Sequence, residues 1–409
     1  MPAPTPNIAI LGSGTFAKAS YLPALLSLHP TTLNFHSIWS RSPESAQSLL
    51  SVAQESSSIS PELKSGDEGL ESILANPEID GVLIVLPITS QPDLVIRCLK
   101  AGKHVMSEKP LAKVVDDARV LIQRYEREYK TKGLIWRVAE NYSHEPILRE
   151  AGELISNTPE LGPILFWNLN MQGYIEDGSK YQKTTWRTIP DYQGGFLLDG
   201  GVHWTALLRV VLPTSARPSS LISFSSLHRT HLLPHDTLQA ISLPSKSSTT
   251  ESHGPKTKLT TAVNDETKVP GGIGKSSPTG QILISFAGSN IPQDKALPNG
   301  VRITFLNGVM DVTAGFNEES GDRTFKIEVV PGEGTGVKSY KTEGKMDGVK
   351  VEIDHFAKAI KELKGGNKLD EDSEGNYAKP RDALWDLAVL EGMLKSHGKE
   401  VSVDEMVGK

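Results

Sequence analysis

The sequence contains only one cysteine, Cys98, among its 409 residues. A single thiol forms no intramolecular disulfide and no cysteine cluster for a structural metal, so the sequence predicts a protein of a reducing compartment and no metal site. No apolar run reaches the roughly 20 residues that a membrane-spanning helix needs. The proline-rich stretch 1–6 has neither the basic nor the apolar region of a secretory signal. We therefore expect a cytoplasmic protein without a membrane partner.

An excess of positive charge is also missing. The formal net charge is −6, and no dense basic stripe offsets it. These features argue against binding to nucleic acid or to an anionic membrane, and they favour a small-molecule substrate. At 409 residues, with 38% hydrophobic residues, the chain exceeds what one core usually supports. We expect two domains, at 1–140 and 141–409.

A glycine turn follows the first apolar run. Residues 7–11 are apolar, the sequence GSGTFA occupies 12–17, and a helical stretch continues to about residue 28. Gly12 allows a tight turn, Gly14 lets a pyrophosphate approach the backbone, and the helix N-terminus then faces the phosphates. The order strand, glycine turn, helix predicts a dinucleotide-binding domain. Pro23 is expected to kink or split the helix.

The next predicted strand, 35–39, ends in Ser40-Arg41 and carries no acidic residue where an NAD-preferring site often has one. A guanidinium beside a hydroxyl suits the 2′-phosphate of NADP, because arginine presents several donors to an anion. We predict NADP as the cofactor, with NAD as the open alternative. Taken alone, Arg41 could equally be a solvated turn residue.

Lys109 is the first candidate for a catalytic residue. The continuous apolar run 81–87 and the short strand 103–106 are typical of a buried parallel sheet, and Lys109 follows at a strand's carboxyl end. That edge binds ligands in open α/β sheets. A lysine before Pro110 is held out of the helical conformation, which directs its ammonium group. The alternative is a surface salt bridge between Lys109 and Glu108.

The second half of the chain alternates polar and apolar residues, as in 165–171, which indicates half-exposed strands. An α+β domain on a largely antiparallel or mixed sheet is expected. The stretch 244–279 is rich in Ser, Thr, Gly and Lys, and we predict a flexible surface insertion there. Further strands are predicted at 219–228, 237–243, 280–287, 301–306 and 325–330, and helices at 351–364 and 380–396.

Asp199 and His203 form a second candidate constellation. If the helix that ends near Leu212 begins near Asp199, a spacing of four residues places both side chains on one face. Histidine titrates close to neutral pH, so it can accept a proton from an alcohol or return one to a carbonyl oxygen. Asp199 could instead be a helix N-cap, and His203 a satisfied core histidine.

Taken together, these motifs resemble the family of glucose-fructose oxidoreductase, inositol dehydrogenase and rhizopine catabolism oxidoreductases (Gfo/Idh/MocA). The resemblance implies an N-terminal Rossmann domain with a doubly wound parallel sheet, and a C-terminal α+β domain with a large open-faced, mostly antiparallel sheet. It also implies hydride transfer between NADP(H) and a secondary alcohol or carbonyl of a sugar, polyol or related compound. The three motifs occur in the family's order: Gly12-x-Gly14, Glu108-Lys109-Pro110 and Asp199-x-x-x-His203.

The resemblance further implies residue roles. Lys109 would polarise the reacting oxygen, His203 would be the acid/base, and Asp199 would orient or charge-balance the imidazole. Many members carry Arg where this chain has Ser143, followed by His144, so the groups that anchor the substrate stay open. The cofactor contacts it implies are Gly12, Gly14, Thr15, Phe16, Ser40, Arg41, Leu86, Pro87, Glu108, Asn141, Trp186 and Arg187.

Two other functions remain as alternatives. One is a non-catalytic dinucleotide-binding regulator, because the fold also occurs in a fungal galactose-pathway repressor. The other is a dihydrodiol or biliverdin-type reductase of the same family. An open sheet face often pairs with a second copy of the chain, so we also expect a homodimer.

Overall fold

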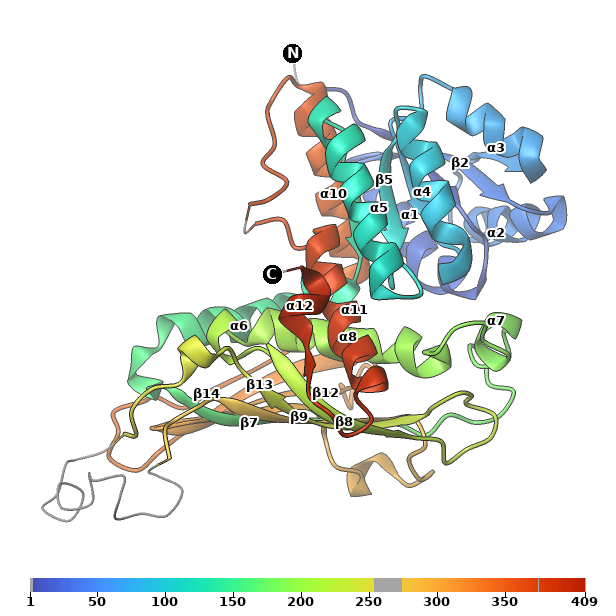
Figure 1. The fold of residues 1–409 in the computed structure, drawn as a ribbon. Helices are drawn as coiled ribbons and strands as arrows, with labels where there is room; N and C mark the ends of the chain where they lie inside the picture. The colour runs from blue at the N-terminus through green and yellow to red at the C-terminus, as the bar shows by residue number, and fades with distance from the viewer. Residues whose placement is uncertain (1–2, 254–273, 374, 409) are drawn as a thin grey trace, which may run out of the picture.

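A computed structural model describes residues 3–253, 274–373 and 375–408. The chain forms an N-terminal unit around one sheet and a second unit around a larger sheet (Figure 1). Both predicted sheet types are confirmed. Residues 254–273 of the predicted insertion lie outside the described residues, so its flexibility stays a prediction. The described flanks contain a short helix, η7 (Lys246–Ser248), and a bridge between Thr250 and Ser276.

The N-terminal sheet has the strand order β3-β2-β1-β4-β5-β6, and all neighbours are parallel. The order reverses between β1 and β4, and the crevice at such a reversal is where this class of sheet binds ligands. The strands are β1 Asn7–Leu11, β2 Asn34–Ser40, β3 Glu62–Ser65, β4 Gly81–Ile84, β5 His104–Glu108 and β6 Trp136–Ala139.

Helices connect these strands. The helix after the glycine turn is split as expected near Pro23, into a π-helical segment and an α-helix. Strand β3 and helices α2 and α3 were not predicted. The helical elements are η1 Ala17–Tyr21, α1 Leu22–Leu28, α2 Pro43–Ser56, α3 Gly66–Ala75, η2 Ile88–Ser90, α4 Gln91–Lys100, α5 Val115–Glu128 and η3 Lys130–Lys132.

The second sheet has the order β14-β13-β12-β11-β7-β10-β9-β8-β15. Neighbours are antiparallel except β7 and β10. Strands β12 and β14 and helix α6 were missed in the sequence. The strands are β7 Ile164–Gln172, β8 Ser220–Ser226, β9 Thr237–Leu243, β10 Thr279–Ser285, β11 Asn299–Phe305, β12 Gly308–Phe316, β13 Arg323–Pro331, β14 Tyr340–Lys345 and β15 Val401–Ser402.

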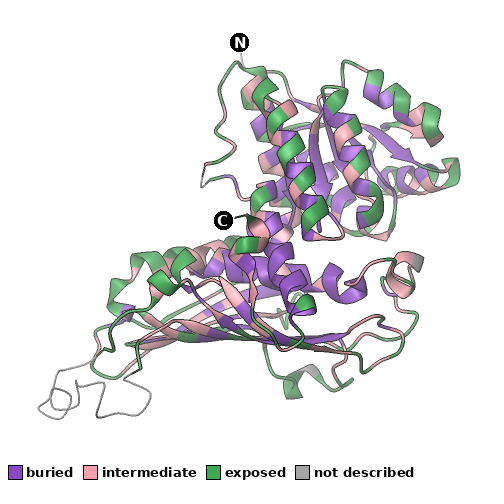
Figure 2. Cartoon of the chain, viewed as in Figure 1, coloured by how far each residue is buried: buried purple, intermediate pink, exposed green. Residues whose placement is uncertain are grey.

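Helices α6 (Pro146–Asn157), α8 (Gly195–Val211) and α11 (Pro380–Ser396) lie on one face of this sheet (Figure 1). They are buried where they meet the strands (Figure 2). The strands turn alternate residues the other way, where Phe224 and Ile241 stay exposed. The remaining short elements are η4 Asn141–His144, η5 Pro159–Leu161, α7 Thr185–Thr188, η6 Thr214–Ala216, η8 Gln293–Lys295 and α12 Val403–Val407.

Helix α10 (Gly348–Lys364) departs from the predicted division at residue 140. Its Phe356 and Ile360 are fully buried and pack in one cluster with Ile8 and Leu83 of the parallel sheet. A Cβ at Gly81 would lie 2.8 Å from Ile360, so the contact is close. A segment late in the chain therefore completes the N-terminal unit. A single position in the sequence does not divide the two units.

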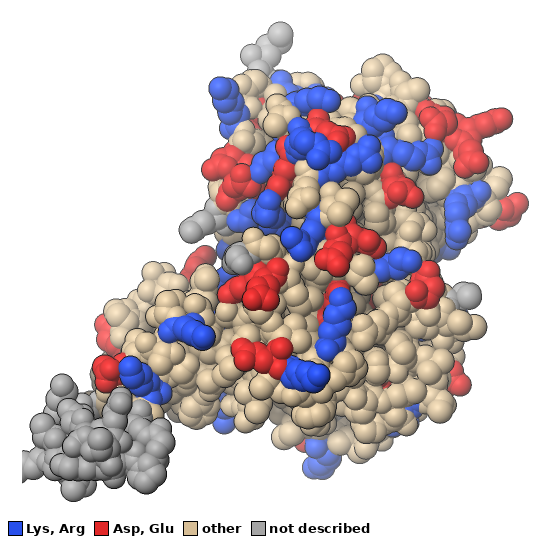
Figure 3. Space-filling view, in the orientation of Figure 1, with Lys and Arg blue, Asp and Glu red and all other residues tan. Residues whose placement is uncertain are grey.

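The surface charge is mixed. Basic and acidic side chains alternate over the N-terminal unit on the face in Figure 3, and the second unit is mostly uncharged there. Within the described residues, no helix has the length and apolar character to cross a membrane.

Candidate active site

The glycine turn leaves room beside the first strand. Gly12 has φ +130°, and a Cβ there would lie 2.2 Å from the Val85 carbonyl oxygen, so only glycine fits. A Cβ at Gly14 would meet nothing within 4 Å. Thr15 and Phe16 begin the helical segment that follows. Open space before a helix N-terminus suits a phosphate group.

The other predicted cofactor residues of this domain lie along the same edge of the sheet. Ser40 ends β2 and is buried, whereas Arg41 is exposed and forms no ion pair within 4.0 Å among the described residues. Leu86 and Pro87 follow β4 and are half-buried. Asn141 follows β6. Because parallel strands end at one edge, residues far apart in sequence meet here.

Lys109 reaches into the second domain. Its Nζ donates to the Oδ1 of Asp199 and to the Asp199 backbone oxygen, both at 3.0 Å. The other carboxylate oxygen, Oδ2, accepts from the Nε (2.9 Å) and Nη2 (2.8 Å) of Arg187. All three side chains are at most 14% exposed. Burial alone would raise the pKa of Asp199, but the two cations outweigh it and lower the pKa to about 2.

Glu108 does not pair with Lys109, so the alternative of a surface salt bridge is wrong. Its carboxylate is buried and accepts a hydrogen bond of 2.7 Å from the Tyr21 hydroxyl. Burial raises the pKa of Glu108 to about 7, although the charge of Lys109 partly offsets this. Glu108 therefore stabilises the end of β5, next to Lys109. The contact of Glu108 with a cofactor stays a prediction.

His203 has a different partner from the predicted one. Its Nδ1 lies 2.7 Å from Oε1 of Glu140, and its ring stacks on Tyr142 with centroids 4.9 Å apart. Asp199 is bonded to Lys109 and Arg187, so the prediction that it orients the imidazole is wrong. With Nδ1 held by a carboxylate, Nε2 is the nitrogen left to exchange a proton.

Glu140 was missed in the sequence. It follows β6 directly, at the same edge of the sheet as Lys109. A carboxylate at a strand end was therefore the sequence feature that could have identified Glu140. Its side chain is 3% exposed. Burial would raise the pKa of Glu140, but the neighbouring His203 outweighs burial and holds that pKa below its usual value.

Asp199 is not a helix N-cap, and His203 is not a core histidine. Helix α8 begins at Gly195 with Gly194 as its N-cap, so Asp199 lies inside the helix and is not a cap. His203 is not a fully buried core histidine, because 21% of its side chain is exposed and it lines a cavity of about 590 Å³. Asn141 lines the same cavity.

Trp186 and Arg187 lie on the short helix α7. The Arg187 guanidinium sits 3.9 Å from the centre of the Trp186 ring, a cation–π contact. Arg187 thus stacks on its neighbour while it binds Asp199, so α7 is tied to the Lys109 site.

Ser143 and His144 do not reach the cavity, so neither anchors a substrate. Ser143 is fully buried and accepts a hydrogen bond of 2.7 Å from Arg209. His144 is 2% exposed, and burial holds its pKa well below the usual value. This pair is part of the interior.

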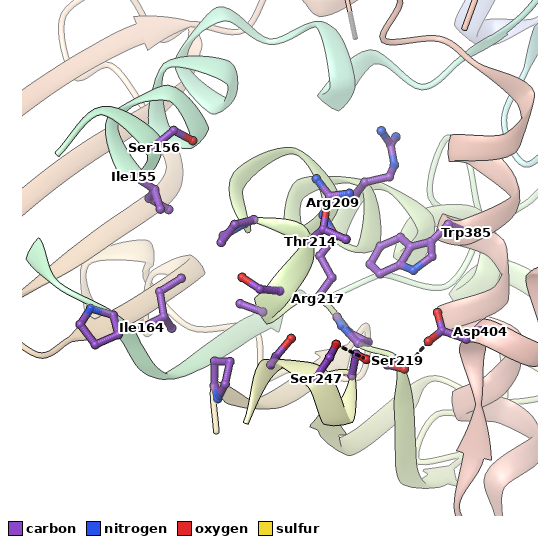
Figure 4. A pocket seen from close by; sticks show the side chains of 18 of the residues that line it. Ile155, Ser156, Ile164, Arg209, Thr214, Arg217, Ser219, Ser247, Trp385 and Asp404 are labelled. Carbon is purple, nitrogen blue, oxygen red and sulfur yellow. Dashed lines mark hydrogen bonds between the residues drawn. The ribbon is translucent and has the colours of Figure 1, made fainter. Parts of the chain in front are cut away.

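A larger cavity of about 930 Å³ lies elsewhere, near the C-terminal end of α8 and beside α11. Arg209, Arg217 and Trp385 line it (Figure 4). No predicted site residue lines this cavity. We place the site at the smaller cavity, because that one holds His203 and adjoins Phe16 of the glycine-turn helix. Among the described residues, no group of three or more His, Cys, Asp or Glu is arranged to hold a metal ion.

Fold and site together define a two-domain, dinucleotide-binding protein of the Rossmann class. Residues 6–134 match the model of an oxidoreductase family with an NAD-binding Rossmann fold, GFO_IDH_MocA. The N-terminal domain of the chain belongs to this family. The predicted resemblance is confirmed.

Individual relatives support the same class. The chain is 39% identical over 240 residues to a dehydrogenase, FPY6, of Fusarium mangiferae, covering 58% of this chain and 66% of that protein. It is 29% identical over 147 residues to D-xylose 1-dehydrogenase (NADP(+)) 2 of Haloferax volcanii, covering 36% and 42%. The chain thus spans less than two thirds of the length of these curated relatives. An oxidoreductase structure from Thermotoga maritima shares the fold, with a TM-score of 0.72, 22% identity and coverage of 98% and 99%.

Proposed function

We propose that the protein is an NADP(H)-dependent oxidoreductase that transfers a hydride between the nicotinamide and a secondary alcohol or carbonyl of a sugar, polyol or related compound. One observation carries the proposal. His203 of the second domain shares a cavity with Phe16, which follows the glycine turn, Lys109 follows β5 of the first domain, and each of the two cations is held by its own carboxylate.

Two features of the chain fit the cofactor. The open space at Gly14 suits a pyrophosphate, and Arg41, which is exposed and has no ion pair among the described residues, follows β2, where the adenosine ribose of a bound dinucleotide is held in this class of fold. A bound nicotinamide supplies the hydride chemistry. The chain supplies the binding, the charge and the proton path.

Lys109 has the geometry to stabilise an oxyanion. Asp199 fixes the position of its Nζ, and a buried ammonium group acts strongly on developing charge where water is excluded. His203 accepts the alcohol proton at Nε2 during oxidation and returns it during reduction. Glu140 holds the imidazole by Nδ1 and stabilises the imidazolium that forms. These roles account for all four side chains.

A panel of ketoses, aldoses and other carbonyl compounds tests the proposal through NADPH oxidation. We expect turnover with at least one member, lost in His203→Ala and kept in Thr304→Ala, a change on the second sheet that lies outside the cavity. NADPH binding without turnover of any compound would favour the non-catalytic regulator instead. Turnover limited to dihydrodiols or to biliverdin would favour the third function.

We also propose a homodimer that acts in the cytoplasm. Phe224 and Ile241 are 67% and 56% exposed on the open sheet face, and Ile241 lies directly opposite Ile222 in the β8–β9 register. Apolar side chains grouped on such a face favour burial against a second copy. Sedimentation velocity is expected to give a dimer, and Ile241→Lys a monomer. A wild-type monomer at micromolar concentration would reject the dimer.

A further inference from the structure

The cavity beside His203 is also lined by basic side chains. Its volume of about 590 Å³ is in the range of small-molecule sites. It lies between the helix after the glycine turn, η4, and the start of α10. The cationic side chains that line it are Arg323, Lys345 and Lys350.

Arg323 is the cation of this cavity without a counter-ion. Lys345 pairs with Asp322 at 2.9 Å and Lys350 with Asp347 at 3.8 Å. Within the described parts of the chain, no carboxylate lies within 4.0 Å of the exposed Arg323 guanidinium. An exposed guanidinium in a concave site presents a planar set of donors to an anion.

The position of Arg323 is linked to the predicted acid/base. Tyr142 stacks on His203, and the charge of the nearby Arg323 partly offsets the burial that raises the pKa of Tyr142 to about 12. Tyr142 is itself buried and packs edge-on against Phe325 of β13, with ring centroids 5.1 Å apart. One fixed aromatic ring therefore separates the guanidinium from the imidazole.

The acidic groups in the cavity do not cancel this charge. The Glu145 carboxylate accepts the backbone N–H groups of Asp347 and Gly348, both at 3.0 Å. Burial raises the pKa of Glu145 to about 7, so it is only partly ionised at neutral pH. Asp347 lies beside Lys350. Arg323 is left to a ligand.

We propose that the substrate carries an anionic group, a carboxylate or a phosphate, which Arg323 binds while the reacting carbon lies at His203. The substrate class is then a sugar acid or a sugar phosphate rather than a neutral sugar. This inference rests on the proposed function, because His203 marks the reacting end of the cavity.

Calorimetric titration of the NADPH-bound protein tests the inference without requiring turnover. The ligands are methyl glucoside, the corresponding uronate and the corresponding 6-phosphate. We expect at least one acidic ligand to bind tenfold or more tightly than the neutral one, as charge-assisted hydrogen bonds to a guanidinium allow. The tighter of the two identifies the anion.

Arg323→Gln should remove that preference and leave NADPH affinity unchanged. Arg302→Gln is the matched control, because Arg302 is an exposed arginine of β11 that pairs with Asp311 at 2.7 Å and does not line the cavity. Equal binding of neutral and acidic ligands, no binding of any of them, or full uronate and phosphate binding by Arg323→Gln would overturn the inference. Binding that depends on Arg323 with no turnover of any alcohol would instead reject the proposed function and leave the anion site standing.

Discussion

Glu140→Gln separates charge from shape at the predicted acid/base. Glutamine keeps an oxygen that can accept from Nδ1 of His203, so the ring orientation is retained while the negative charge is lost. The pair is 2.7 Å apart, and Glu140 is 3% exposed, so solvent screens it poorly. The substitution therefore tests whether this carboxylate stabilises an imidazolium.

The size of the effect follows from Coulomb's law. Charge centres about 4 Å apart interact by about 4 kcal/mol at an effective dielectric constant of 20, equivalent to about 3 pH units. Because 21% of the His203 side chain is exposed, solvent screens the pair in part, and we expect an effect smaller than this limit. A carboxylate favours the protonated ring, so its loss moves the acidic limb of kcat/KM for alcohol oxidation to lower pH.

The assay is the initial rate of NADP reduction across pH, using whichever alcohol the enzyme turns over. Asp199→Asn is the matched control, because it also removes one buried carboxylate from the site. That carboxylate pairs with Lys109 and Arg187 and not with His203. The control substitution should lower the rate at every pH without moving the limb. An unmoved limb in Glu140→Gln, or an equal shift in Asp199→Asn, would refute the reasoning.

Three further predictions concern Lys109, Arg41 and Asp199. Lys109→Ala should lower kcat by about 100-fold or more, as loss of an oxyanion donor does, with NADPH binding nearly unchanged in a fluorescence titration; unchanged turnover would remove Lys109 from the mechanism. Arg41→Asp should reverse the preference for NADPH over NADH in the same titration, and tighter NADH binding by the wild type would reject the Arg41 argument. The pKa of Asp199 is lowered to about 2 in the folded protein, so its carboxylate contributes stability above pH ~4, on the order of 2 kcal/mol, which is lost as the pH falls toward 2. Thermal denaturation of wild type and Asp199→Asn should therefore show a stability difference at pH ~7 that shrinks by pH ~2, and a constant difference would contradict the assignment.

Several residues of the candidate site could be predicted from the order of the strands and of the polar residues that follow them. Lys109 and the glycine turn could be predicted because the carboxyl ends of parallel strands lie at one edge of the sheet. A residue at a strand end can therefore be placed at that edge from the sequence. The same rule applies to Glu140, which directly follows β6. Spacing alone paired Asp199 with His203. In the structure, two side chains four apart on one helix turn to different partners.

The parallel sheet, the glycine turn and the candidate residues Lys109 and His203 could be predicted from the sequence, because each rests on a local pattern. Tertiary contacts set which carboxylate pairs with which cation. They also place α10 against the first domain and bring Arg323 into the cavity that His203 lines. The Lys109–Asp199 and His203–Glu140 contacts join residues 90 and 63 positions apart, and their energy depends on burial and distance, which no local pattern records.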